Sequence, residues 1–187
     1  MAAPMTRGSN VALTREIPSL TGVVVGVKLH STERVLVDNL VVATILCDSS
    51  GKALSDEHFV FFNQLSSPEL SVTQLAHAVG RDTEQVEIDL DAVPTEVSRI
   101  VVVTYINEGN LARRTLGQLN EASVRVLNLA DNTELVRSEN LASGLHNESG
   151  LALGELYRHG GGWKFKVIGQ GYRDGIRAMA ADFGISL

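Results

Sequence analysis

The sequence predicts a mainly β fold, a two-sheet β-sandwich with a short C-terminal helix, as a single domain over residues 1–187. Its apolar runs are short and rich in β-branched residues, and turn residues interrupt them at close spacing. Many short strands joined by close turns are typical of two packed sheets. With 187 residues and 44% hydrophobic content, the chain can bury a core of its own. No shift in composition and no long linker indicates a second domain.

Six apolar runs each have about the length of one strand. They are residues 21–29, 40–47, 58–63, 85–90, 99–106 and 122–129. Residues 151–172 then predict a long hairpin, because Gly160, Gly161 and Gly162 give its turn the necessary backbone freedom.

Helical periodicity is nearly absent until residues 173–184. Four apolar residues recur there at helical spacing, namely Ile176, Met179, Ala180 and Phe183. Gly184 follows as a stop signal, so the sequence predicts one helix at this end.

Residues 78–94, AVGRDTEQVEIDLDAVP, contain five carboxylates and raise the question of a metal site. Apolar and acidic residues alternate from 86 to 90, which places Glu87 and Asp89 on one face of a strand. Carboxylates two positions apart on a strand are separated by about 7 Å, too far to close easily around one ion. We interpret these two acids as a solvated strand face.

Asp82 and Glu84 differ from the other acids of this stretch. A loop opened by Gly80 could aim both carboxylates inward at a cation. Two carboxylates nevertheless fall short of the roughly six to eight oxygens that calcium takes.

Catalytic motifs are absent from the sequence. The five histidines are scattered without zinc-site spacing, and neither a Gly-x-Ser-x-Gly elbow nor a Gly-x-x-x-x-Gly-Lys phosphate loop occurs. The single cysteine, Cys47, cannot form an internal disulfide and lies in a predicted core strand, where a thiol reacts poorly. We therefore expect no catalytic residues and a non-enzymatic function. A remote third hypothesis is an enzyme that acts on a small anion.

The charge balance excludes further classes of function. Sixteen basic and 22 acidic residues give a formal charge of −6, which disfavours nucleic acid and anionic lipid surfaces. No run approaches the roughly 18 apolar residues of a membrane span. Together with the lone cysteine, this predicts a cytoplasmic protein that binds no nucleic acid and is not an integral membrane protein.

Four segments follow one another in a distinctive order. They are MTRGSNVALT near the start, DSSGKALSDEHFVFFNQLSSPELSV, EQVEIDLDAVPTEVSRIVVVTYI and GELYRHGGGWKFKVIGQGY. Together they resemble the TerD domain, a family of tellurium-resistance and general stress proteins of bacteria. The resemblance covers almost the whole chain and implies a β-sandwich that binds calcium through acidic residues in two places.

The chain departs from the family at both of these places. An Asp-Leu-Asp motif is matched by residues 39–41, NLV, which leaves Asn39 and the adjacent Asp38 as remnants. A glycine-rich acidic loop is matched by the shorter QLAHAVGRDTEQ, whose remnants are Asp82 and Glu84. Because both the number and the charge of the ligands fall, we expect no tight calcium site and no other cofactor.

Basic residues at the predicted hairpin form a candidate surface for an anionic partner. Alternation along residues 163–167 places Lys164 and Lys166 on one face, near Arg158 and His159 across the turn. The alternative is that both lysines only solubilise an outward face while the aromatic residues between them pack the core.

Arg113 and Arg114 form a second candidate contact, because their stretch connects two strands in the family and loops often carry function. Two functions follow. The first is a non-enzymatic TerD-like stress-response protein that joins other stress-response or membrane-associated proteins as an interaction or scaffold module and has lost tight calcium binding. The alternative is a calcium-binding TerD protein with a reduced-ligand site made by Asp38, Asp82, Glu84 and backbone carbonyls.

Overall fold

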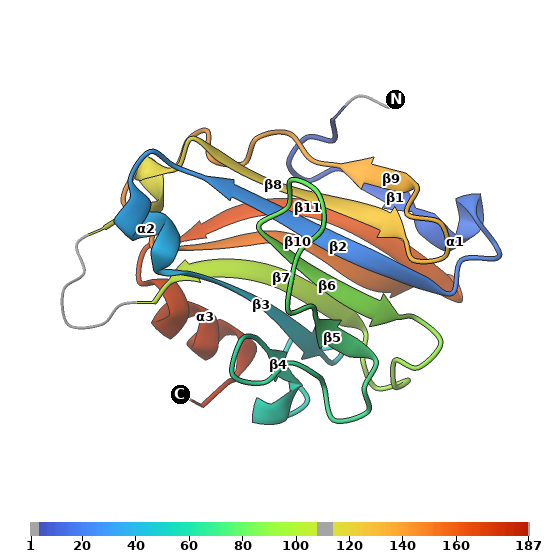
Figure 1. Cartoon of the computed structure of the whole chain (residues 1–187). Coiled ribbons are helices and arrows are strands. Elements are labelled where there is room, and N and C mark those ends of the chain that lie inside the picture. The colour runs from blue at the N-terminus through green and yellow to red at the C-terminus, as the bar shows by residue number, and fades with distance from the viewer. Residues whose placement is uncertain (1–3, 108–113, 187) are drawn as a thin grey trace.

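The computed structural model describes residues 4–107 and 114–186. They form two antiparallel sheets, of six and five strands, that pack face to face (Figure 1). The predicted β-sandwich is confirmed.

The strand order brings segments far apart in the sequence side by side. The six-stranded sheet has the order β1 (Asn10–Ala12), β11 (Gly162–Tyr172), β10 (Gly150–His159), β7 (Arg99–Ile106), β3 (Leu40–Cys47) and β4 (Phe59–Val60). The five-stranded sheet has the order β5 (Val72–Gln74), β6 (Glu84–Asp89), β2 (Gly22–His30), β8 (Glu121–Asn128) and β9 (Glu134–Arg137).

Alternating residues of both sheets fill the core between them. On β6, Val86 and Ile88 are buried while Glu87 and Asp89 point away from the core, as the sequence predicts. On β11 the buried residues include Phe165, which is fully enclosed. Burial of this β-branched and aromatic surface is the main force that holds the sheets together.

The helix α3 (Gly175–Phe183) covers part of the outer face of the six-stranded sheet (Figure 1). Met179 and Phe183 are buried there in a second apolar cluster with residues of β3, β7 and β10. The helix ends at Gly184, whose φ of 69° lies in the left-handed region that favours glycine. The predicted C-terminal helix is confirmed.

Several short elements were not predicted. They are α1 (Leu13–Glu16), α2 (Arg34–Asp38), the 3-10 turns η1 (Asp56–His58) and η2 (Leu116–Gln118), and the short strands β1, β5 and β9. Elements of three to five residues are too short to display a period.

The strand expected over residues 58–63 is wrong in its length, since β4 spans only Phe59–Val60. Phe61 and Gln64 exchange two backbone hydrogen bonds, so the chain turns where the apolar run continues. Among the described residues, no helix has the length and apolar character needed to cross a membrane.

Candidate functional site

Asp82, one of the two acids expected to remain from a calcium loop, binds a guanidinium. Both of its carboxylate oxygens accept from Nε of Arg125 at 3.0 Å, and Oδ2 also accepts from Nη2 at 2.9 Å. The side-chain amide of Gln85 donates to Oδ2 at 2.7 Å. The Asp82 side chain is only 4% exposed, so these bonds replace its solvation.

A glycine on the neighbouring strand makes room for this ion pair. Gly26 of β2 is in register with Arg125 on one side and with Gln85 on the other. A Cβ added to Gly26 would clash with the carboxylate of Asp82, because it would lie closer than unbonded atoms can approach. A glycine inside a β-branched strand is therefore the sequence signal that could have indicated the close approach.

Arg125 also links Asp82 to Glu134 of β9, because its Nη1 lies 3.5 Å from Oε1 of Glu134. The same oxygen lies 2.6 Å from Nη2 of Arg137. The hydrogen bond that Arg125 donates to Asp82 is the main cause that raises the pKa of Arg125, and the hydrogen bond from Arg137 is the main cause that lowers the pKa of Glu134. Asp82, Arg125 and Arg137 border a cavity of about 390 Å³ on the outer face of the five-stranded sheet. Its lining is rich in basic groups, which is unsuited to a cation.

The other three calcium-site candidates meet elsewhere. Asp38, Asn39 and Glu84 line a cavity of about 260 Å³, which Asp82 does not reach. The structure thus brings three of the four candidates together and separates the fourth. Burial raises the pKa of Glu84, because desolvation disfavours its charged form.

Gln74 also borders this cavity. Its Oε1 is buried and has no hydrogen-bond partner in the described part of the chain. Asn39 donates its amide to the carbonyl of Val35 at 2.7 Å, which leaves its own oxygen for other contacts. No three His, Cys, Asp or Glu side chains within residues 4–107 and 114–186 converge closely enough to share one metal ion.

Arg158, predicted to contact a partner, is exposed, but its guanidinium is bonded to the protein's own backbone. Its guanidinium donates to the backbone carbonyls of Val97, Val93 and Pro94 at 2.8 to 3.1 Å. It also lies over the ring of Trp163, 4.4 Å from the ring centre. These contacts fasten the connection between β6 and β7 to the hairpin.

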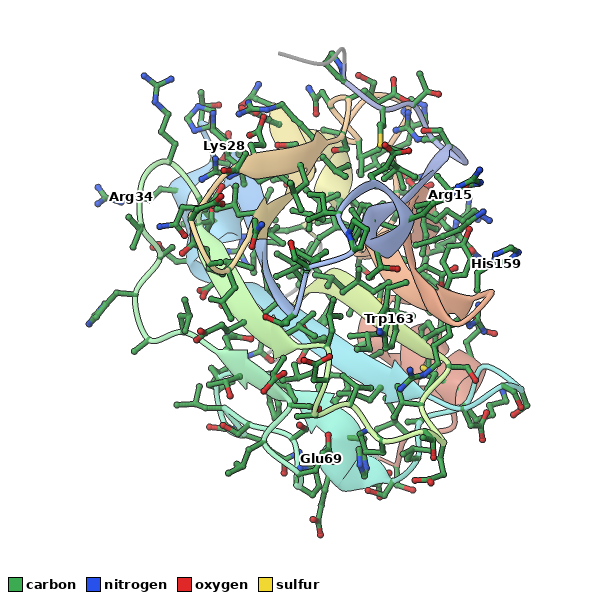
Figure 2. All side chains as sticks on the ribbon, turned by 90° about the vertical axis from the view of Figure 1, so that its right-hand side faces the viewer. Arg15, Lys28, Arg34, Glu69, His159 and Trp163 are labelled. Atoms are coloured by element: carbon green, nitrogen blue, oxygen red, sulfur yellow. The ribbon has the colours of Figure 1, made fainter. Side chains whose placement is uncertain are left out.

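His159 and Lys164 do lie together at an accessible place. With Arg15 of α1 they border a cavity of about 530 Å³ at the turn between β10 and β11. Figure 2 shows Arg15 and His159 extending from the same edge of the sandwich. The turn has φ of 58° at Gly160 and 79° at Gly161, a conformation that favours glycine at both positions.

The remaining candidates lie apart from this turn. Lys166, two positions beyond Lys164 on the same face, borders a different cavity beside α3. Arg113 lies outside the described residues, and Arg114 is half-buried just before η2. The hydroxyl of Ser31, shortly before α2, donates to the carbonyl of Gln118, which places η2 near α2. Figure 1 places α2 at the end of the sandwich opposite the β10–β11 turn. The expected basic residues therefore occupy at least three separate places.

Cys47 is fully buried at the end of β3. Burial is the main cause that raises the pKa of its thiol to about 12. A thiol in this state is protonated and inaccessible, which makes it a poor nucleophile or metal ligand.

Comparison with known proteins gives one consistent family. The chain is 36% identical to a tellurium resistance protein TerD of Serratia marcescens, over 100% of this chain and 99% of the relative. It is 35% identical to general stress protein 16U of Bacillus subtilis, over 100% of both chains. The crystal structure of a telluride resistance protein (TerD) homologue from Streptomyces coelicolor A3(2) has a similar fold, with a TM-score of 0.66, 17% identity, and coverage of 87% of this chain and 96% of that one. The TerD domain model matches residues 1–183, and the chain belongs to the TerD domain family.

Proposed function

We propose that this protein is a non-enzymatic interaction module of a bacterial stress response of the tellurium-resistance type, acting in the cytoplasm without tight calcium binding. The ion pair between Asp82 and Arg125 is the observation that carries the proposal. A guanidinium already satisfies the carboxylate that the family resemblance assigns to calcium. To bind there, calcium would have to displace a bidentate partner and enter a cavity rich in positive charge.

The interaction surface of this proposal is the β10–β11 turn. Arg15, His159 and Lys164 border its cavity and give it a basic character on a chain whose formal charge is −6. Charge complementarity favours an acidic surface on another stress-response or membrane-associated protein. Arg158 contributes by keeping the turn rigid rather than by touching the partner.

Thermal unfolding with added calcium tests the loss of the metal site. A ligand that binds only the native state raises the free energy of unfolding by RT ln(1 + [L]/Kd), or about 2.7 kcal/mol at 100 times Kd. We expect millimolar calcium to change the midpoint no more than magnesium does at the same concentration. A calcium-specific rise would contradict the proposed loss.

The second candidate function, a calcium protein with a reduced-ligand site, is favoured by one observation. Asp38, Asn39 and Glu84 share a cavity with Gln74, whose buried Oε1 has no hydrogen-bond partner in the described residues. If this site binds calcium, Glu84→Gln abolishes the calcium-specific rise, whereas Glu87→Gln on the outward face of the same strand leaves it unchanged.

Copurification from the native cells tests the interaction surface. The bait is the full chain, either wild type or carrying Arg15→Gln with Lys164→Gln. The matched control carries Lys28→Gln with Arg34→Gln, which removes the same charge at the edge opposite Arg15 in Figure 2. We expect stress-response partners, identified by mass spectrometry, to be lost in the first double variant and kept in the control. Equal retention in both would refute the surface.

A further inference from the structure

A second polar cavity, of about 340 Å³, lies on the outer face of the six-stranded sheet. We call it the helix-end cavity, because the last residues of α3 border it together with the turn that precedes Lys52. Three basic side chains line it, those of Lys52, Arg99 and Lys166, and two acidic ones, those of Glu155 and Asp182. The proposed partner surface at the β10–β11 turn is a separate cavity.

Strand register brings the central charges of this cavity together. Lys166 of β11 is directly opposite Glu155 of β10. Arg99 of β7 is paired with Tyr157, two positions along the same strand from Glu155. Residues two apart on a strand point to the same side, so these side chains all face outward, away from the core that holds Phe165. The cluster therefore follows from register, although its members are up to 67 positions apart in the sequence, from Arg99 to Lys166.

The negative groups of the cavity are already engaged. The Glu155 side chain is only 9% exposed and lies 3.4 Å from Nη1 of Arg99. The carboxylate of Asp182 accepts from the hydroxyl of Tyr172 at 2.8 Å, while its backbone carbonyl accepts from Nζ of Lys52. Both acids thus have partners inside the fold.

Positive charge is left over for a ligand. Among the described residues, no carboxylate forms an ion pair with Lys166. Arg99 contacts Glu155 with one nitrogen only, at a distance that is long for a charge-assisted hydrogen bond. Three cations against two carboxylates make the cavity net positive on a net negative chain.

The Arg99 guanidinium also lies against the backbone of a neighbouring turn. Its other terminal nitrogen lies against Gly51, where a Cβ would clash with it, and Gly51 has a φ of 85°. The turn around Gly51 is held by Asp48, whose Oδ1 accepts from the backbone of Ser50 at 2.9 Å and of Lys52 at 3.1 Å. A guanidinium and an ammonium on the same outer face of the sheet, bordering one cavity, match the charge of a tetrahedral oxyanion.

We propose that the helix-end cavity binds a small oxyanion of the phosphate class, with Arg99 and Lys166 as direct donors and Lys52 as the third positive group. Free inorganic phosphate and the phosphoryl group of a small metabolite present the same oxygens to these donors. The site needs neither calcium nor a protein partner, so the phosphate proposal can be refuted without affecting the proposed interaction function.

Isothermal titration of the full chain at low ionic strength tests the site. The ligands are inorganic phosphate and, in a second arm, glycerol 3-phosphate, with chloride at matched ionic strength as the blank. We expect saturable one-to-one binding of at least one of them with a Kd at or below about 1 mM. The tighter of the two identifies the source of the phosphate group. Absence of saturable binding by both up to about 10 mM would overturn the proposal.

Three variants locate the binding. Lys166→Gln should weaken it about tenfold, because a charge-assisted hydrogen bond is lost. Lys164→Gln removes the same charge from the same strand face but from the neighbouring cavity, and should change Kd less than about twofold. Glu155→Gln should tighten binding, since it removes the carboxylate that competes for Arg99. Equal weakening by both lysine variants would show that the anion is attracted only by general surface charge. Weaker binding in Glu155→Gln would contradict the assignment of Arg99 as a direct donor.

Discussion

Replacement of Arg125 by methionine removes the guanidinium that binds Asp82 and keeps most of the aliphatic length of the side chain. The variant leaves a carboxylate that is 4% exposed with a single strong donor, the amide of Gln85. A buried charge that loses its partner retains the cost of its desolvation without the attraction that offset it.

The magnitude follows from burial and geometry. Removal of one partner of a fully buried pair costs about 3–5 kcal/mol. Arg125 is 24% exposed, so water reaches part of the site and the cost falls to about 2–4 kcal/mol. For a domain of this size each kcal/mol lowers the melting temperature by roughly 2–4 °C, which gives a decrease of roughly 4–16 °C.

Urea unfolding followed by fluorescence measures this difference. Lys28→Met is the matched control, because Lys28 pairs with Glu121 at 3.2 Å on the same sheet while both side chains are about one-third exposed. We expect the control to cost less than about 1 kcal/mol. Addition of Asp82→Asn to Arg125→Met should recover much of the loss, since the neutral amide needs no cation. If Arg125→Met costs no more than Lys28→Met, the ion pair does not stabilise the fold and the reasoning fails.

Three further predictions concern Cys47, Glu84 and Arg158. Cys47, with a pKa of about 12 and no exposed surface, should react with a thiol reagent only after unfolding in urea; modification of the native protein at neutral pH would contradict its burial. Burial raises the folded-state pKa of Glu84, so its protonated form favours folding in acid, and this contribution is lost as pH rises through that pKa. In urea unfolding, Glu84→Gln should therefore be more stable than wild type at about pH 7 and equally stable at low pH. A difference in stability that does not change with pH would refute this. Arg158→Lys should lower the free energy of unfolding by about 1–3 kcal/mol, because lysine cannot bond three carbonyls while it stacks on Trp163. An unchanged midpoint of urea unfolding would show that Arg158 does not stabilise the fold and would make it a candidate for partner contact again.

Local patterns predicted the elements that bury alternating residues over a strand length or more. The alternation around Ile88 and the helical spacing that ends at Gly184 both appear in the structure as expected. Patterns failed where the chain reverses within an apolar run, as after Phe61, because a turn depends on backbone bonds that composition does not reveal. They also failed for elements of one helical turn.

The candidate site divides in the same way. The sequence indicated four candidate metal ligands, namely Asp38, Asn39, Asp82 and Glu84. It could not indicate that Asp82 pairs with Arg125, 43 positions away, or that Asp82 and Glu84 line different cavities. Similarly, the hairpin lysines were visible, but their separation into two cavities was not.

The sequence by itself determined the sandwich, the terminal helix and the family. Each of these depends on periodicity, composition or the order of neighbouring residues, which are local properties of the chain. The tertiary structure alone decided the partner of Asp82, the backbone carbonyls that Arg158 binds and the cluster around Arg99. These depend on strand register and on the packing of segments distant in sequence, and a cation becomes a partner or a ligand site only when the fold sets its distance from a carboxylate.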